Sequence, residues 1–112
     1  MKKITILACL QANDVCAGMA CLDALEERRA HFQIYEGEPV RLCAFLRCSQ
    51  CGVDPEEHAG MLEKLERIVR CGVDTAHIGV CTTRQDGSVC PHMKKTAAWL
   101  EEKGIQIVWG TH

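Results

Sequence analysis

Residues 4–10 read ITILACL, a short apolar run interrupted by a single threonine, and this run decides the fold class. A strand that is covered on both faces has such a nearly continuous apolar sequence, as in the parallel sheets of α/β proteins. Further strands are predicted at residues 40–46, 75–81 and 105–109. The chain therefore has four candidate strands, and the first is expected to be buried.

Segments with helical spacing of their apolar residues separate these strands. The first predicted helix covers residues 18–31, the second covers residues 54–72, and the third covers residues 90–104. Asp54 and Pro55 are typical of a helix start, and a glycine follows the end of the second and third segments. Strands and helices thus alternate along the whole chain.

Alternating strands and helices with short connections indicate parallel strands joined by right-handed crossovers. The sequence predicts an α/β fold, a three-layer sandwich with a four-stranded parallel sheet in the sequence βαβαβαβ and the strand order 2-1-3-4. A chain of 112 residues fits one domain, so residues 1–112 are expected to form a single unit.

Charge and hydropathy exclude several classes of partner. The net charge is −2 and the lysines and arginines are not clustered, so neither nucleic acid nor an anionic membrane is an expected partner. No run approaches the roughly 20 apolar residues of a membrane span. The apolar run at residues 4–10 is too short for the core of a signal peptide, which indicates a cytoplasmic protein.

Most of the nine cysteines and three of the five histidines lie where a predicted strand ends or in the loop after it. Parallel folds place these loops at one edge of the sheet, where ligands bind near the point at which the strand order reverses. The sequence therefore predicts one site, drawn from Cys9, Cys16, Cys21, Cys48, Cys51, Cys81, Cys90, His77, His92 and His112.

Several thiolates at one place repel each other unless a cation, retained protons or disulfide bonds offset the charge. The C-x-x-C spacing of Cys48 and Cys51 lets one loop bind a single ion, and neutral imidazoles can complete a sulfur and nitrogen ligand set. Zinc is the favoured metal, and an iron–sulfur cluster is the alternative. The expected ligands are Cys9, Cys48, Cys51, Cys81, Cys90, His92 and His112, with Cys16, Cys21 and His77 as further candidates.

Two other interpretations of the cysteines stay open. Cys48 and Cys51 could perform thiol–disulfide exchange, although one dithiol leaves the other cysteines at that edge unexplained. Any single cysteine can also be an apolar packing residue, which is the interpretation for Cys43 inside the second strand and Cys71 at the end of the second helix. A phosphatase site is excluded, because Val15 stands where the oxyanion-binding arginine is required.

The ordered set of cysteines and histidines, with Cys90-Pro91-His92 and the closing Gly110-Thr111-His112, resembles the CGGC domain family over nearly the whole chain. That resemblance implies a small protein that binds metal, zinc above all. Cys48 and Cys51 match the outer members of the motif that names the family, but Ser49 and Gln50 replace its two glycines.

The resemblance does not decide whether the chain is an enzyme. No substrate pocket is evident from the sequence, and a metal-dependent sensing or interaction module fits equally well. The exposed edge strands of a four-stranded sheet could pair in a homodimer.

Overall fold

The computed structural model describes residues 1–84 and 86–112. Its strands are β1 (Lys2–Ala8), β2 (Val40–Arg47), β3 (Thr75–Ile78) and β4 (Gln106–Trp109), and its α-helices are α1 (Met19–Glu27), α2 (Ala59–Cys71) and α3 (Pro91–Glu102). All paired strands are parallel, in the order β2-β1-β3-β4. The predicted α/β class and strand order are confirmed.

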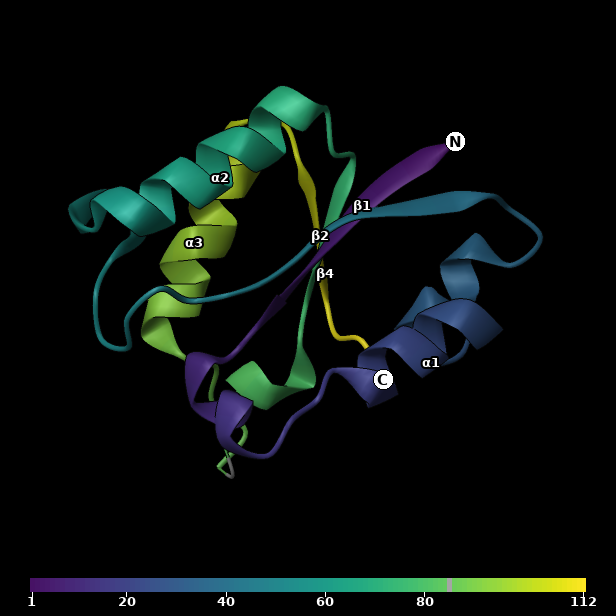
Figure 1. Cartoon of the computed structure of the whole chain (residues 1–112), viewed down its shortest axis with the longest axis horizontal. Helices are drawn as coiled ribbons and strands as arrows, with labels where there is room; N and C mark the ends of the chain where they lie inside the picture. The colour runs from purple at the N-terminus through teal and green to yellow at the C-terminus, as the bar shows by residue number, and fades with distance from the viewer. Residues whose placement is uncertain (85) are drawn as a thin grey trace.

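The sheet separates two apolar cores. Figure 1 shows α2 and α3 on one side of the sheet and α1 on the other. Leu7 and Ile78 of the sheet pack with Leu65 of α2 and Leu100 of α3, whereas Ile4 and Ile6 pack on the opposite side with residues of α1 and the segment after it. This arrangement is the three-layer sandwich expected from the sequence.

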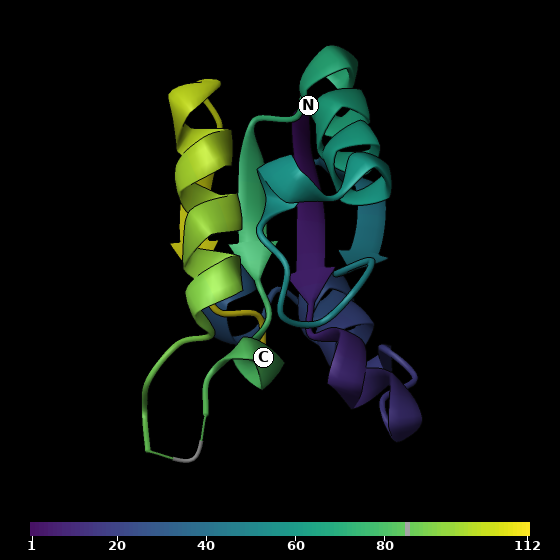
Figure 2. The ribbon, with the colours of Figure 1, turned by 90° about the vertical axis from the view of Figure 1, so that its left-hand side faces the viewer.

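All four strands point the same way, so their carboxyl ends form one edge. Figure 2 shows the arrowheads directed downwards, with the segments that follow β1 and β3 below them. The candidate site residues were expected at this edge. None of the helices in residues 1–84 and 86–112 is both long and apolar enough to cross a membrane.

Two predicted strands are shorter than expected, and both give way to a turn of 3-10 helix at the site edge. β1 ends at Ala8, not at residue 10, and Cys9 precedes the 3-10 helix η1 (Leu10–Asp14). β3 ends at Ile78, not at residue 81, and η4 (Val80–Thr82) follows Gly79. The apolar residues Leu10 and Val80 continue the strand pattern beyond the strand ends, although neither turn is buried as a whole.

The first helix is also shorter than the predicted segment 18–31. α1 ends at Glu27, because Arg28 adopts a left-handed backbone conformation with φ 56°. The Arg28 guanidinium donates hydrogen bonds to the carbonyls of Tyr35 at 3.3 Å and Glu38 at 3.2 Å, and these bonds stabilise the turn. A separate 3-10 helix, η2 (Ala30–Tyr35), then supplies Phe32 to the core.

The second helix begins at Ala59 and not at the predicted Asp54–Pro55 start. Asp54 and Pro55 instead begin a short 3-10 helix, η3 (Pro55–Glu57). His58 precedes α2, and its Nδ1 atom accepts a hydrogen bond from the Met61 backbone N–H at 3.1 Å. Asp54 is therefore free to interact with α3.

Candidate metal centre

A small cavity at the carboxyl edge of the sheet brings together side chains from four parts of the chain. Its volume is about 30 Å³. Its lining residues that can bind a metal are Cys9, Cys48, Cys51, Cys90 and His92. We call this hollow the thiol cavity. Its volume suits an ion or a water-sized group, whereas pockets for organic ligands measure roughly 300–1,000 Å³.

Strand ends and helix starts position the cavity thiols. Cys9 directly follows β1, Cys48 directly follows β2, and Cys90 precedes the first residue of α3. The backbone N–H of Cys90 donates to the carbonyl of Thr82 at 3.0 Å, which ties the start of α3 to the turn after β3. Because β1 lies between β2 and β3, these loops meet around Cys9.

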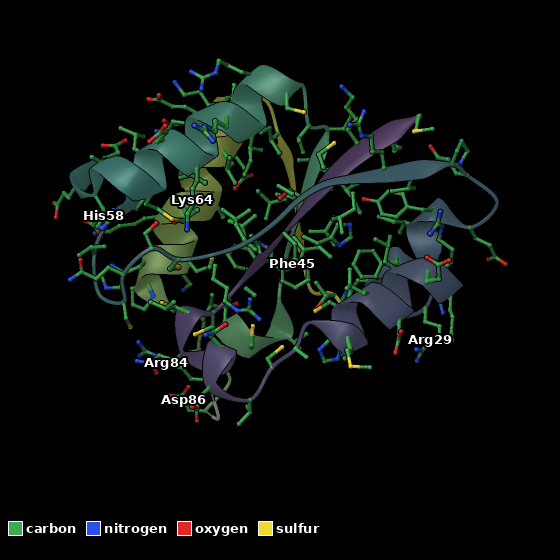
Figure 3. The ribbon with its side chains drawn as sticks, in the orientation of Figure 1. Arg29, Phe45, His58, Lys64, Arg84 and Asp86 are labelled. Atoms are coloured by element: carbon green, nitrogen blue, oxygen red, sulfur yellow. The ribbon has the colours of Figure 1, made fainter. Side chains whose placement is uncertain are left out.

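The cavity thiols act on one another electrostatically. The pKa of the Cys48 thiol is raised, first by burial and then by the charges of Cys90, Cys9 and Cys51. Lys64 opposes this rise. Its Nζ atom donates to the carbonyl of Arg47 at 3.0 Å, and Figure 3 shows this side chain extending from α2 towards β2.

His92 has a partner that determines which ring nitrogen is available. Its Nδ1 atom donates to Oδ1 of Asp54 at 3.1 Å, and Lys95 Nζ donates to Oδ2 at 2.8 Å. The hydrogen bond from Lys95, followed by the one from His92, lowers the pKa of Asp54. With Nδ1 engaged, Nε2 of His92 is the nitrogen left to bind a metal, as in carboxylate–histidine–metal arrangements.

The loop that carries Cys48 and Cys51 has no positive φ angle at Ser49 or Gln50. Among the described residues other than glycine, positive φ angles occur at Arg28 and Ala30, so Ser49 and Gln50 have ordinary backbone conformations. The left-handed position of this turn is Gly52, with φ 85°. Cys51 is exposed, and its Sγ atom accepts a hydrogen bond from Gln11 Nε2 at 3.4 Å.

Cys81 lies outside the thiol cavity. Its Sγ atom accepts a hydrogen bond from the backbone N–H of Cys9 at 3.2 Å, close to Gly79. Burial raises the pKa of the Cys81 thiol, whereas the Cys9 N–H lowers it, and the charges of Cys9, Cys21 and Cys16 raise it further. Cys9 therefore acts on both thiols, whereas Cys21 and Cys16 act on Cys81 and not on Cys48.

Cys16 and Cys21 belong to the α1 side. The Cys16 Sγ atom accepts a hydrogen bond from the Gly18 N–H at 3.3 Å, and the buried Cys21 thiol donates to Thr111 Oγ1 at 3.4 Å. His112 is exposed at the end of the chain and does not line the thiol cavity. The predicted site residues are thus divided between two neighbouring groups.

His77 is a core residue with both ring nitrogens engaged. It is fully buried; Nε2 lies 2.7 Å from the Tyr35 hydroxyl and Nδ1 lies 3.1 Å from the Gly110 carbonyl. A carbonyl only accepts, so Nδ1 donates to Gly110 and Nε2 accepts from Tyr35. This arrangement leaves no nitrogen of a neutral His77 for a metal.

Asp54 and Gln11 contact site residues, and Lys64 lies near Cys48, although none of the three is a candidate ligand from the sequence. Their types carry no signal of such a role, since aspartate before proline is typical of a helix start and Gln11 and Lys64 are ordinary surface residues. Among residues 1–84 and 86–112, no group of three or more Cys, His, Asp or Glu side chains is arranged to hold a metal ion.

The sequence matches the profile of a known domain family over nearly its whole length. The CGGC domain profile matches residues 3–112. The chain belongs to the CGGC domain family. The match includes every residue of the thiol cavity, and membership of the CGGC family favours metal binding. No curated protein and no solved structure matches the chain.

Proposed function

We propose that this CGGC-domain protein binds a metal ion through residues of the thiol cavity, with zinc as the favoured ion. The observation that carries the proposal is the convergence of Cys9, Cys48, Cys51, Cys90 and His92 on one cavity of about 30 Å³. A tetrahedral zinc site requires four sulfur or nitrogen ligands, and the cavity offers five, which would have to move closer together to bind one ion.

Repulsion between the thiolates of the cavity supports the same proposal. Cys90, Cys9 and Cys51 raise the pKa of Cys48 because several thiolates in one place repel each other. A divalent cation reverses this effect, since it stabilises each thiolate that binds it. The Asp54–His92 hydrogen bond supports the proposal independently, because it orients the imidazole and leaves its Nε2 atom for a metal.

The proposed ligand set is smaller than the set predicted from the sequence. Cys81 and His112 do not line the cavity, and His77 is engaged on both nitrogens, so we do not include them. A bound zinc ion would supply either a structural cross-link or a Lewis acid. All nine cysteines are free thiols, which suits a reducing compartment such as the cytoplasm.

Elemental analysis of protein purified without oxygen tests the proposal. We expect close to one zinc per chain in the wild type and loss of the metal in the Cys48→Ser/Cys51→Ser double variant. Cys43→Ser is the matched control, because Cys43 lies on β2 but outside the thiol cavity. This variant should keep the metal. A folded wild-type protein without metal would refute metal binding.

The same preparation separates the two alternatives. An iron–sulfur cluster would colour the protein and give iron in the elemental analysis, whereas zinc is colourless. A redox role for Cys48 and Cys51 is favoured by their C-x-x-C spacing and by the exposure of Cys51. It predicts a reversible Cys48–Cys51 disulfide in metal-free protein, which titration of thiols before and after mild reduction would detect when the wild type is compared with the Cys48→Ser/Cys51→Ser variant.

A further inference from the structure

A second pair of cysteines lies away from the thiol cavity. Cys43 of β2 and Cys71, the last residue of α2, line one mainly apolar groove of about 410 Å³. Cys71 is exposed and Cys43 is half-buried, so small molecules in solvent can reach the pair. Neither residue has a role in the proposed metal site.

The Cys43 Sγ atom donates to the Arg41 carbonyl at 3.8 Å, and Cys71 is the thiol that influences the ionisation of Cys43. The pKa of Cys43 is raised by burial, then by hydrogen bonding to Cys71 and by its charge, whereas Arg41 and Lys3 lower it. The thiols that act on Cys48 are Cys90, Cys9 and Cys51. The chain thus contains a two-thiol group that is electrostatically distinct from the cavity.

Residues of β1 contact the segments that carry both members of the pair. Ile4 pairs with Leu42 and Thr5 pairs with Ala44, so Cys43 is the extra residue of a β-bulge. Bulges redirect side chains and often occur near functional sites. At the other end, Lys3 Nζ donates to the carbonyl of Cys71 at 3.0 Å. Neighbouring residues of β1 therefore position both cysteines.

We propose that Cys43 and Cys71 form a reversible disulfide by exchange with a low-molecular-weight disulfide. The exposed Cys71 loses its proton and attacks one sulfur of that disulfide, which forms a mixed disulfide and releases one small thiol. Cys43 then loses its proton and attacks the Cys71 sulfur, which releases the second small thiol. The protein dithiol is oxidised, and the small disulfide is reduced to two thiols.

This bond would link the end of α2 to the bulge of β2. The linked segment, residues 43–71, contains Cys48, Cys51 and Asp54. Oxidation would therefore fix both ends of the segment that carries part of the thiol cavity. The disulfide itself forms without a metal, so the inference does not depend on the proposed metal site.

Peptide mapping of the full-length protein tests this proposal. Reduced wild-type protein is incubated with oxidised glutathione without oxygen, its remaining thiols are alkylated, and its peptides are identified by mass. We expect the Cys43 peptide to be linked to the Cys71 peptide, with the loss of two hydrogen atoms, and reduced thiol should reverse the link. Cys48→Ser should give the same cross-link.

The Cys43→Ser variant identifies the intermediate. Without the second thiol, Cys71 should remain as a mixed disulfide with glutathione. In the wild type, the proposal is overturned if both cysteines stay open to alkylation, if Cys71 keeps the glutathione, or if it links to a cysteine other than Cys43. The wild-type map decides the question even if a variant does not fold.

Discussion

The cysteines of this protein lie in different environments. Cys48 is half-buried among three other thiols, Cys81 accepts a hydrogen bond from the Cys9 backbone, and Cys43 lines a groove together with Cys71. The electrostatic cost of a thiolate differs at each place. The environment therefore separates the candidate ligands from the other cysteines better than sequence spacing does.

Asp54 is the residue outside the ligand set whose effect on metal binding is easiest to predict. Asp54→Asn keeps the shape of the side chain but removes the charge that fixes the orientation and tautomer of His92. Loss of such a partner typically weakens metal affinity by about 10–100-fold. We expect a decrease in this range, measured by competition with a chromophoric zinc chelator.

Asp86→Asn is the matched control for this change. Asp86 also accepts hydrogen bonds, from the Ser88 N–H at 2.9 Å and its hydroxyl at 2.6 Å, but it does not line the thiol cavity. Its replacement should leave zinc affinity unchanged. Equal affinities for the Asp54 variant and the wild type would show that His92 does not bind the metal through Nε2.

The convergence of three cysteines on one cavity was predictable from the sequence. Cys9, Cys48 and Cys90 lie at strand or helix ends, and parallel topology alone brings such ends to one edge. The separation of Cys81 from the cavity depends on the turn after β3, and the contact of Asp54 depends on η3. Neither turn has a composition that distinguishes it from a continued strand or helix.

At the scale of secondary-structure elements, a buried hydrogen-bond chain joins three segments. Tyr35 of η2 donates to His77 of β3, and His77 donates to Gly110 after β4. Phe32 packs against the imidazole with a ring-centroid distance of 4.5 Å. This chain links the α1 side of the sheet to the last residues of the protein.

Tyr35→Phe removes one donor from this chain. The His77 Nε2 atom would remain buried without its partner, and an unsatisfied buried polar group costs about 1–3 kcal/mol. We expect the free energy of unfolding in urea to fall by that amount. An unchanged free energy of unfolding would show that the hydrogen bond contributes nothing net to stability.

Protonation of His77 predicts how stability depends on pH. Burial lowers the pKa of His77 below its ordinary value of 6.5, so the unfolded chain takes up this proton at a higher pH than the folded chain does. The contribution of His77 is complete above pH 6.5 and is lost as the pH falls towards its folded pKa. The expected loss is at most about 1.4 kcal/mol per pH unit.

Urea unfolding between pH 7 and pH 5 measures this loss. His77→Gln keeps a polar side chain that does not titrate, so its free energy of unfolding should decrease less steeply over this interval than that of the wild type. Identical slopes for the two proteins would contradict the assignment of this pH dependence to His77.

Element types were more predictable than element ends. Apolar runs predicted all four strands, and the helical spacing of apolar residues predicted all three α-helices. These patterns follow directly from the burial of one or both faces of each element. The end of α1 at Glu27 was not predictable, since Arg28 adopts positive φ only with the support of carbonyls from Tyr35 and Glu38. The bulge at Cys43 likewise results from pairing with β1.

At the scale of the whole molecule, the strand order determines where chemistry can occur. β1 lies between β2 and β3, so the residue after it is surrounded by the residues that follow both neighbours. The thiol cavity occupies this position, while the Cys43–Cys71 pair lies at the groove between β2 and α2. The Cys43–Cys71 pair is thus separate from the thiols that lie at the carboxyl edge of the sheet.

A crystal structure of protein prepared without oxygen, with data collected on both sides of the zinc absorption edge, tests the metal site most directly. The account predicts one anomalous peak in the thiol cavity, from a zinc ion bound by the sulfur atoms of Cys48 and Cys51. The remaining ligands come from the set Cys9, Cys90 and His92. A zinc peak held by other residues, or zinc-loaded protein with no peak in the cavity, would contradict it.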